Sequence, residues 1–168
     1  MLRLSEQIAL TAARALATLG LCLLLTLAAM TLADGLARWL LNQPIEGVRD
    51  VGALVVAVAI ACCLPSGLAE RGNITIRLLE GVHPRISKLL DVAASALVLV
   101  IMGLLAWQVW VHAAIVARDA EATWILKLPT APFWYAVALV LWCAVFVQAT
   151  VVGLEVHRLV TPAPRAPS

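Results

Sequence analysis

The chain has 168 residues, of which 63% are hydrophobic and 13% are charged, and its mean hydropathy is +0.99. A soluble globular domain has about 45–50% apolar and about 25% charged residues, so the composition excludes an ordinary soluble domain. The net charge of +2 comes from 12 basic and 10 acidic residues, with no run of Lys or Arg. Nucleic-acid binding requires a basic face or stripe, and we therefore expect no nucleic-acid partner.

Charged residues are missing from four long segments of the chain, residues 15–33, 51–69, 92–117 and 128–154. A transmembrane helix needs about 20 consecutive apolar residues. The pattern predicts an all-α integral membrane protein with four transmembrane helices, at about 15–33, 51–69, 92–117 and 133–154. We expect residues 1–160 to form a single four-helix membrane domain, and the Pro-rich residues 161–168 to form a short disordered tail.

The first 14 residues predict a short helix at the membrane interface, ahead of the first span. Leu4, Ile8 and Ala12 recur at a spacing of four residues, which places them on one face of an amphipathic helix. A cleaved signal peptide is the competing interpretation, because the small residue Ala33 closes the apolar stretch like a cleavage site. That stretch is longer than the usual 7–15 residues of a signal peptide, which favours a retained span.

Prolines and glycines divide the remaining connections. Residues 34–50 predict a polar connection with a turn at Pro44 and Gly47. Pro65 predicts that the last turn of the second span is kinked or frayed. Prolines are tolerated in the first turn of a helix, and two of them mark the expected start of the fourth span, Pro129 and Pro132.

The longest hydrophilic stretch, residues 70–91, predicts an amphipathic interfacial helix between spans two and three. Asn73 suits the N-cap position, and Pro84 is expected to stop the helix. Four apolar side chains share one arc of the helical wheel, Ile74, Leu78, Leu79 and Val82. The helix either lies flat on the membrane or docks against a partner helix, and its composition does not separate the two.

The distribution of Lys and Arg predicts that both termini are cytoplasmic. Eight of these residues belong to the N-terminus, the middle connection and the tail, namely Arg3, Arg14, Arg71, Arg77, Arg85, Lys88, Arg158 and Arg165. Four belong to the other two connections, namely Arg38, Arg49, Arg118 and Lys127. Cytoplasmic loops carry the excess of positive charge. Trp39, Trp124 and Trp134 then lie near the outer interface, where tryptophans are enriched.

The predicted spans lack the groups that membrane chemistry requires. Ionisable residues inside spans mark ion and proton pathways, and these segments contain only Gln108, His112 and Gln148 as strongly polar side chains. The other two histidines, His83 and His157, lie outside the spans at other depths, so no two of them meet across one haem. We therefore expect no enzyme activity, no metal site and no cofactor.

Tryptophans form a bulky face on the third span. Trp107 and Trp110 lie three residues apart, which places them on one side of a helix, and Trp142 lies in the fourth span. The face contacts either lipid or a groove in a partner protein, and both interpretations stay open. Together, the uncharged spans predict a membrane scaffold that is a subunit of a larger assembly.

Two connections are similar to motifs of a known membrane family. Residues 38–50, RWLLNQPIEGVRD, resemble the first outer loop of the small (Q, or DctQ-type) permease subunit of tripartite ATP-independent periplasmic (TRAP) transporters. In that family an Arg, a hydrophobic triplet and Asn precede a Pro-Ile-x-Gly-x-x-acid pattern. Residues 70–79, ERGNITIRLL, resemble the family's Arg-Gly-(Asn/His)-Ile-x-Val-Asp-Leu-Leu segment, and Pro129 fits its Pro-rich entry to the fourth span. The resemblance covers about residues 10–156.

The resemblance implies a sodium-coupled importer in three parts, in the bacterial cytoplasmic (inner) membrane. A periplasmic binding protein captures a small organic acid, and a large (M-type) membrane subunit moves it inward. The small subunit is a multi-pass scaffold whose partners are the large subunit, the binding protein and the lipid bilayer. From the matched motifs and the tryptophan face, the partner-interface candidates are Arg38, Asn42, Pro44, Gly47, Asp50, Arg71, Gly72, Asn73, Ile74, Arg77, Leu78, Trp107 and Trp110.

Two positions depart from the family pattern. Arg77 stands where the family usually has Asp, which reverses the charge of any contact made there. Asp50 replaces Glu, which is a mild change.

Three other assemblies would share parts of this pattern. The small subunit of a tripartite tricarboxylate transporter has the same four-span architecture. A self-contained homodimeric exporter would need a carboxylate within the membrane, and the membrane anchor of a redox enzyme would need histidines at matched depth. The Asn-Gln-Pro-Ile-Glu-Gly and Arg-Gly-Asn-Ile stretches favour the TRAP type.

The charge distribution leads to a test of topology. A reporter fused after Ser168 is expected to be active in the cytoplasm, because the positively charged connections stay on that side. Paired fusions of alkaline phosphatase and a fluorescent protein measure this. A C-terminus that reports from the periplasm would contradict the four-span arrangement.

Overall fold

The structure is a computed structural model, and it describes residues 2–69 and 84–160. Its helices are α1 (Leu2–Leu41), α2 (Val48–Ala69), α3 (Pro84–Arg118) and α4 (Ala131–Val160). All four are long and apolar enough to cross a membrane. The predicted all-helical architecture is thereby confirmed. The predicted interfacial helix within residues 70–83 and the tail at 161–168 lie outside the described residues.

The first helix is longer than predicted. The predictions of a separate interfacial helix within residues 1–14 and of a polar connection from residue 34 are wrong, since α1 runs unbroken from Leu2 to Leu41. Four threonines of α1 bond back to the carbonyl four residues earlier, so they do not interrupt the helix. The helix ends where Asn42 adopts a φ of 53°, a left-handed conformation that terminates helices.

Prolines mark two helix starts and one helix interior. The last turn of α2 is not frayed, because the helix continues past Pro65 to Ala69, and the predicted kink at Pro65 stays a prediction. Pro65 is fully buried, and proline is tolerated inside membrane helices that pack against neighbouring helices. Pro84 begins α3 and Pro132 is the second residue of α4, as expected of proline in a first turn.

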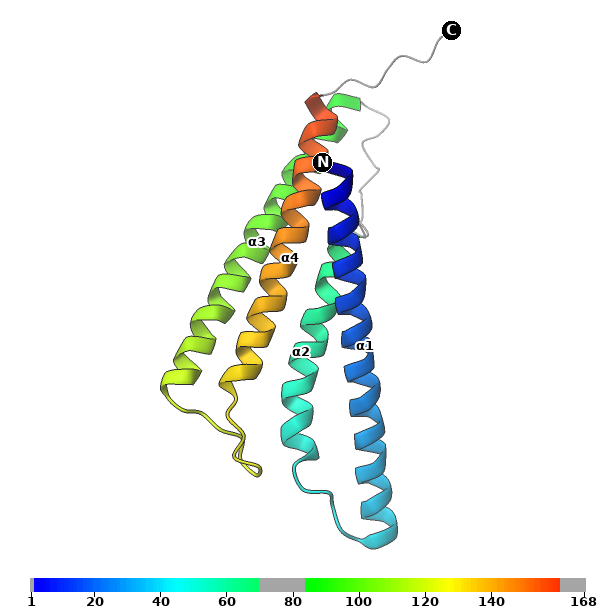
Figure 1. Cartoon of the computed structure of the whole chain (residues 1–168), viewed down its shortest axis with the longest axis vertical. Helices are drawn as coiled ribbons and strands as arrows, with labels where there is room; N and C mark the ends of the chain where they lie inside the picture. Colours follow the sequence, from blue (N-terminus) through cyan, green and yellow to red (C-terminus); the bar gives the residue numbers. More distant parts are fainter. Residues whose placement is uncertain (1, 70–83, 161–168) are drawn as a thin grey trace.

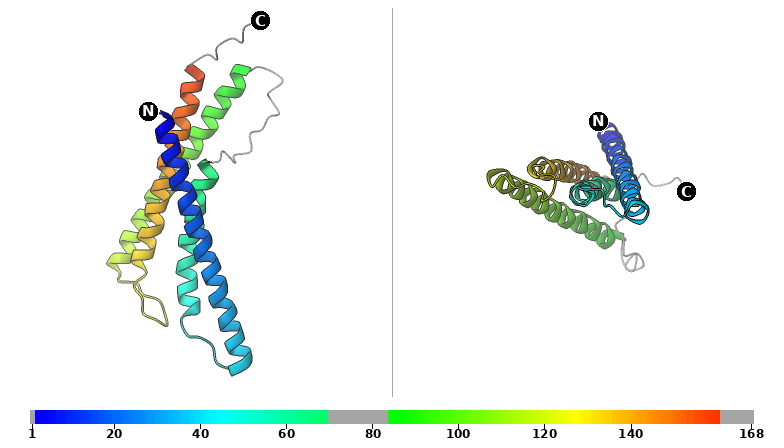
Figure 2. Two further views of the ribbon diagram at one scale, coloured as in Figure 1. Left: turned by 45° about the vertical axis from the view of Figure 1, so that its right-hand side comes forward. Right: turned by 90° about the horizontal axis from the view of Figure 1, so that it is seen from below.

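The helices form two antiparallel hairpins, α1–α2 and α3–α4, which meet along α2 and α4 (Figure 1). The start of α1 and the end of α4 lie at the same end of the bundle. The two hairpins converge there and diverge toward the opposite end (Figures 1 and 2). That opposite end carries the two short connections, residues 42–47 and 119–130, and is called the short-loop end below.

Small side chains let the helices approach closely. Ala61 of α2, Ala106 of α3 and Leu141 of α4 belong to one buried cluster. Five further alanines are completely buried, Ala13, Ala59, Ala113, Ala138 and Ala144. Helix pairs in membranes associate through such faces because small residues bring the backbones together. The bundle therefore gains its cohesion from close packing along α2 and α4.

The outer helices leave most of their apolar surface uncovered. Only 6% of the most hydrophobic stretch of α1 and 11% of that of α3 are buried, against 39% for α4. At 40 residues, α1 is about 60 Å long, roughly twice the thickness of a hydrocarbon core. The free faces of α1 and α3 are therefore available to lipid or to another protein.

A buried amide sets the register of α3 against α4. Gln148 is completely buried, and its Nε2 donates a hydrogen bond of 3.1 Å to the backbone carbonyl of Ser95. The Ser95 hydroxyl in turn bonds to the carboxylate of Glu155. Interhelical polar contacts of this kind hold membrane helices at one relative height. The Nε2 of Gln148, one of the few polar residues in the predicted spans, thus has a structural partner, while its buried Oε1 has none among the described residues.

The closest approach of α1 and α2 leads to a stability test. A Cβ atom at Gly20 would lie 2.8 Å from the carbonyl oxygen of Ala59 and 2.9 Å from Cβ of Cys62. Gly20→Ala is therefore expected to lower the free energy of unfolding by about 1–3 kcal/mol, because backbone cannot move aside cheaply. Gly35→Ala on the same helix is the control, since nothing lies within 4 Å there. Thermal unfolding in detergent compares the two variants with the wild type. Equal unfolding midpoints for Gly20→Ala and Gly35→Ala would contradict the tight contact at Gly20.

Candidate functional site

The connection between α1 and α2, residues 42–47, is anchored by Asp34. Its Oδ1 accepts a hydrogen bond of 2.7 Å from the backbone N–H of Ile45. Its Oδ2 accepts from Nε of Arg38 at 2.9 Å and forms an ion pair with Nη2 at 2.8 Å. Both oxygens are thus engaged, and the turn is folded back against the last turns of α1.

Gly47 brings this turn into contact with the second connection. Its φ of +85° is a conformation that L side chains rarely adopt, and a Cβ there would lie 2.5 Å from Cδ1 of Leu126. Glycine is the residue that supplies such a conformation without steric cost. The predicted turn at Gly47 is confirmed, and the structure adds that the residue also makes room for Leu126.

The second connection, residues 119–130, is called the strap here because it reaches from α3 and α4 across to the start of α2 (Figure 1). Its two halves pair through an antiparallel bridge between Ala122 and Pro129. The backbone N–H of Thr123 donates to the carbonyl of Leu128 at 2.9 Å, and the N–H of Leu128 donates to Oγ1 of Thr123 at 3.1 Å. The strap is therefore a defined loop that presents its tip in one orientation.

Asp50 joins the strap to α2. Its Oδ2 accepts hydrogen bonds from the backbone N–H groups of Ile125, at 2.8 Å, and Leu126, at 3.1 Å. Hydrogen bonds to an ionised carboxylate are stronger than those between neutral groups. Because Asp50 lies in the first turn of α2, this contact connects the two hairpins at the end where they diverge.

The other predicted interface residues lie at the surface or outside the described part. Arg38, Asn42 and Pro44 are exposed at the end of α1 and in its turn. Trp107 is 60% exposed on α3. Trp110 is 40% exposed and packs edge-on against Tyr135 of α4, with ring centroids 5.3 Å apart. Six candidates lie outside the described residues, Arg71, Gly72, Asn73, Ile74, Arg77 and Leu78.

Three residues that organise this end were missed in the sequence. Asp34 is spaced four residues from Arg38, which is a signal for a helical ion pair. Thr123 bonds to Leu128 of the same loop, and Leu126 contacts Gly47 of the other connection, and neither pairing follows a helical spacing that the sequence would reveal. Asp50 was singled out through its motif, and the structure places it in an intramolecular contact.

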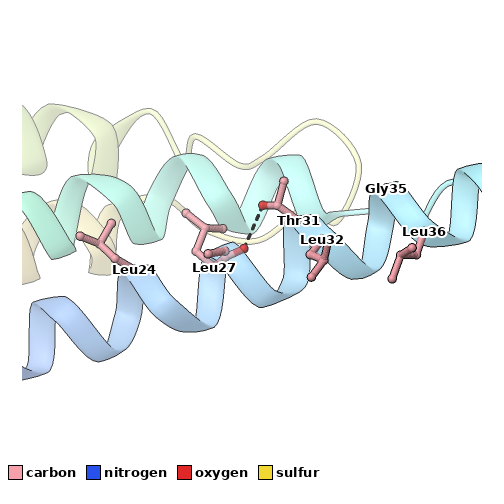
Figure 3. Close-up of a pocket in the computed structure, with 7 residues that line it drawn as sticks. Leu24, Leu27, Thr31, Leu32, Gly35 and Leu36 are labelled. Atoms are coloured by element: carbon pink, nitrogen blue, oxygen red, sulfur yellow. Dashed lines mark hydrogen bonds between the residues drawn. The ribbon is translucent and has the colours of Figure 1, made fainter.

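The described part of the chain offers no cluster of side chains for metal binding. No group of three or more His, Cys, Asp or Glu side chains is placed to hold a metal ion among the described residues. An open groove follows one side of α1 (Figure 3), lined by Leu24, Leu27, Ala28, Thr31, Leu32, Gly35 and Leu36. Its hydroxyl, that of Thr31, donates to the carbonyl of Leu27 at 2.9 Å. The groove therefore suits apolar contact only.

Comparison with known families decides the identity of the chain. The sequence profile described as "Tripartite ATP-independent periplasmic transporters, DctQ component" matches residues 27–156. The chain belongs to this family. It is a small subunit of a TRAP transporter, as the resemblance of its two connections predicted. No curated protein and no solved structure matches the chain.

The matched range of the DctQ family contains the whole short-loop end. It begins within α1 and ends near the close of α4, so it includes Asp34, Asp50 and the strap. The membership also separates the interpretations left open by architecture. It favours the TRAP small subunit over the tricarboxylate transporter subunit, the homodimeric exporter and the redox anchor. The family is one of transporter subunits and not of enzymes.

The contact between Asp50 and the strap leads to a test by hydrogen exchange. In Asp50→Ala the amides of Ile125 and Leu126 lose their acceptor, and we expect them to exchange several-fold faster. In Asp50→Asn, which keeps one neutral acceptor, the exchange rates of these amides are expected to lie between those of the wild type and those of Asp50→Ala.

Glu46→Ala is the matched control, because Glu46 is an exposed acid four residues away. Peptides from the strap are followed by mass spectrometry in detergent or nanodiscs. Equal protection in the wild type and in Asp50→Ala would show that the carboxylate does not hold the strap.

Proposed function

We propose that this chain is the stationary scaffold subunit of a sodium-coupled TRAP importer of small organic acids. In this proposal it packs beside the large (M-type) permease subunit in the bacterial cytoplasmic membrane and contributes to docking of the periplasmic binding protein. Membership of the DctQ family supports the tripartite assembly. The sodium gradient and the substrate then act through the other two subunits.

The scaffold role is supported by one observation: polar side chains within the helices bond to a neighbouring helix. Gln148 and Ser95 bond across the α3–α4 contact, and completely buried alanines such as Ala106 and Ala138 fill the contacts between helices. A transport pathway needs polar or ionisable groups that face a water-filled route. Side chains committed to holding helices together suit a rigid frame better than a moving carrier.

The free faces of α1 and α3 are the surfaces that the proposal assigns to the large subunit. Both helices have apolar stretches that are almost entirely uncovered. Association of membrane helices depends on matching surfaces and close packing. Leu25 of α1 is 63% exposed and Leu104 of α3 is 66% exposed, so neither face is used within the chain.

The short-loop end is the surface that the proposal assigns to the binding protein. Under the predicted topology this end faces the periplasm. Besides Lys127 at the tip of the strap, the exposed charged residues at this end are Arg38, Glu46, Arg49, Arg118, Asp119 and Glu121. Charged residues at the edge of an interface mainly steer association and make it sensitive to salt. Because Asp34 and Asp50 fix both loops, docking would cost little ordering of this surface.

The scaffold proposal is tested by reconstitution into liposomes. The purified chain alone is expected to transport no organic acid under a sodium gradient, because it lacks the coupling groups. Addition of its M-type large subunit and of the binding protein is expected to restore sodium-dependent uptake of a radiolabelled acid.

The large subunit with the binding protein, but without this chain, is the matched control. Uptake by the pure chain would contradict the proposal. Full uptake by the other two components without it would contradict a required scaffold role.

A further inference from the structure

The tip of the strap, residues 124–128, exposes apolar side chains on a fixed backbone. Trp124 is 91% exposed, Ile125 is 51% exposed and Leu126 is 43% exposed. Lys127 is the one charged residue between positions 122 and 130 of the sequence. A tryptophan, two aliphatic residues and a lysine side by side would be poorly placed in water.

The contact with Asp50 determines the depth of this tip. The backbone N–H groups of Ile125 and Leu126 bond directly to the Asp50 carboxylate, at 2.8 and 3.1 Å. Asp50 immediately precedes the charge-free segment that begins at Val51. The tip is therefore held level with the first turn of α2, beside the start of this charge-free segment.

The orientation of the tip is determined as well. The pairing of Thr123 with Leu128 closes the loop behind Trp124, and the near-complete exposure of the Trp124 side chain shows that it points away from the bundle. At this depth, a side chain directed away from the bundle reaches the interfacial layer of the bilayer. A partner arriving from the aqueous side would meet the charged edge of this end first.

We propose that the strap tip is an interfacial lipid anchor. The Trp124 ring and the Ile125 side chain lie among the upper acyl chains, and the Lys127 ammonium binds the phosphate of a phospholipid headgroup. Tryptophan prefers this layer because its ring is apolar while its N–H stays near water, and lysine extends its charge toward the headgroups. Through Asp50 the anchor sets the depth at which α2 enters the membrane.

A second exposed tryptophan, Trp39, lies at the short-loop end of the other hairpin. It lies in the last turns of α1, beside Arg38, and is 80% exposed. The short-loop end thus carries one exposed tryptophan on each hairpin, each next to or near a basic residue. The anchor does not depend on the scaffold role, since it requires only that the chain spans a bilayer.

Spin labels measure the depth of the tip in the full-length chain. A nitroxide at Trp124→Cys, in a background where Cys22, Cys62, Cys63 and Cys143 are replaced by Ala, is studied in nanodiscs of phosphatidylethanolamine and phosphatidylglycerol. Collisions with oxygen report lipid, and collisions with a soluble nickel complex report water. We expect nickel collisions several-fold below those of a label at Glu121→Cys, and oxygen collisions approaching those at Phe146→Cys, which is 71% exposed on α4.

Nickel access equal to that at Glu121 would overturn the anchor. Protection that appears only after the large subunit is added would also overturn it, and would assign the tip to a protein contact instead. In the labelled chain, Asp50→Ala is expected to raise nickel access at position 124, because the tip is then no longer held at the depth of α2.

A second measurement leaves the cysteines unchanged. Tryptophan fluorescence of the wild type and of Trp124→Phe is compared in nanodiscs with and without lipids brominated near the headgroup. The component removed by the substitution is expected to be strongly quenched by bromine. A component that bromine does not quench would place Trp124 in water and contradict the proposal.

Discussion

The hydrogen bonds from Ile125 and Leu126 to the Asp50 carboxylate are the contact on which the short-loop end depends. The two hairpins share a tight seam along α2 and α4 but diverge toward this end. Without a tie between α2 and the strap, each loop would be held only by its own helices. One carboxylate that accepts from two backbone N–H groups of the other hairpin turns two separate loops into one surface. The close contact of Leu126 with Gly47 reinforces that tie.

Two kinds of contact hold the rest of the bundle together, the close packing of small side chains and hydrogen bonds between helices. Alanine-rich faces bring α2, α3 and α4 together, and Gln148 holds α3 and α4 in register near the opposite end. Polar groups are costly in lipid unless they find partners, so each of these contacts also specifies one arrangement. The apolar faces of α1 and α3 remain uncovered. In this DctQ subunit the helices contact one another through small side chains and a few hydrogen bonds, while the outward faces of α1 and α3 contact nothing within the chain.

The sequence predicted the helices well and their ends less well. Long charge-free stretches reveal membrane helices because hydrocarbon excludes unpaired charge. They do not reveal where a helix stops in the polar layer, so α1 extends eight residues past Ala33, to Leu41. Gly47 and Asp50 were found through a motif, and a motif does not reveal which atoms they contact. The partners of Asp50 lie 75 and 76 positions along the chain.

The sequence by itself determined the four long apolar helices and the family of the chain, because these depend on composition and on short local motifs. Only the tertiary structure decided how the polar residues at the helix ends are used. Asp34 and Asp50 look alike in the sequence, as acids beside a charge-free segment. The first folds its own turn back, and the second reaches another hairpin. Which role each carboxylate takes depends on the backbone N–H groups brought near it, and the packing of the helices together with the folding of the two connections places those groups.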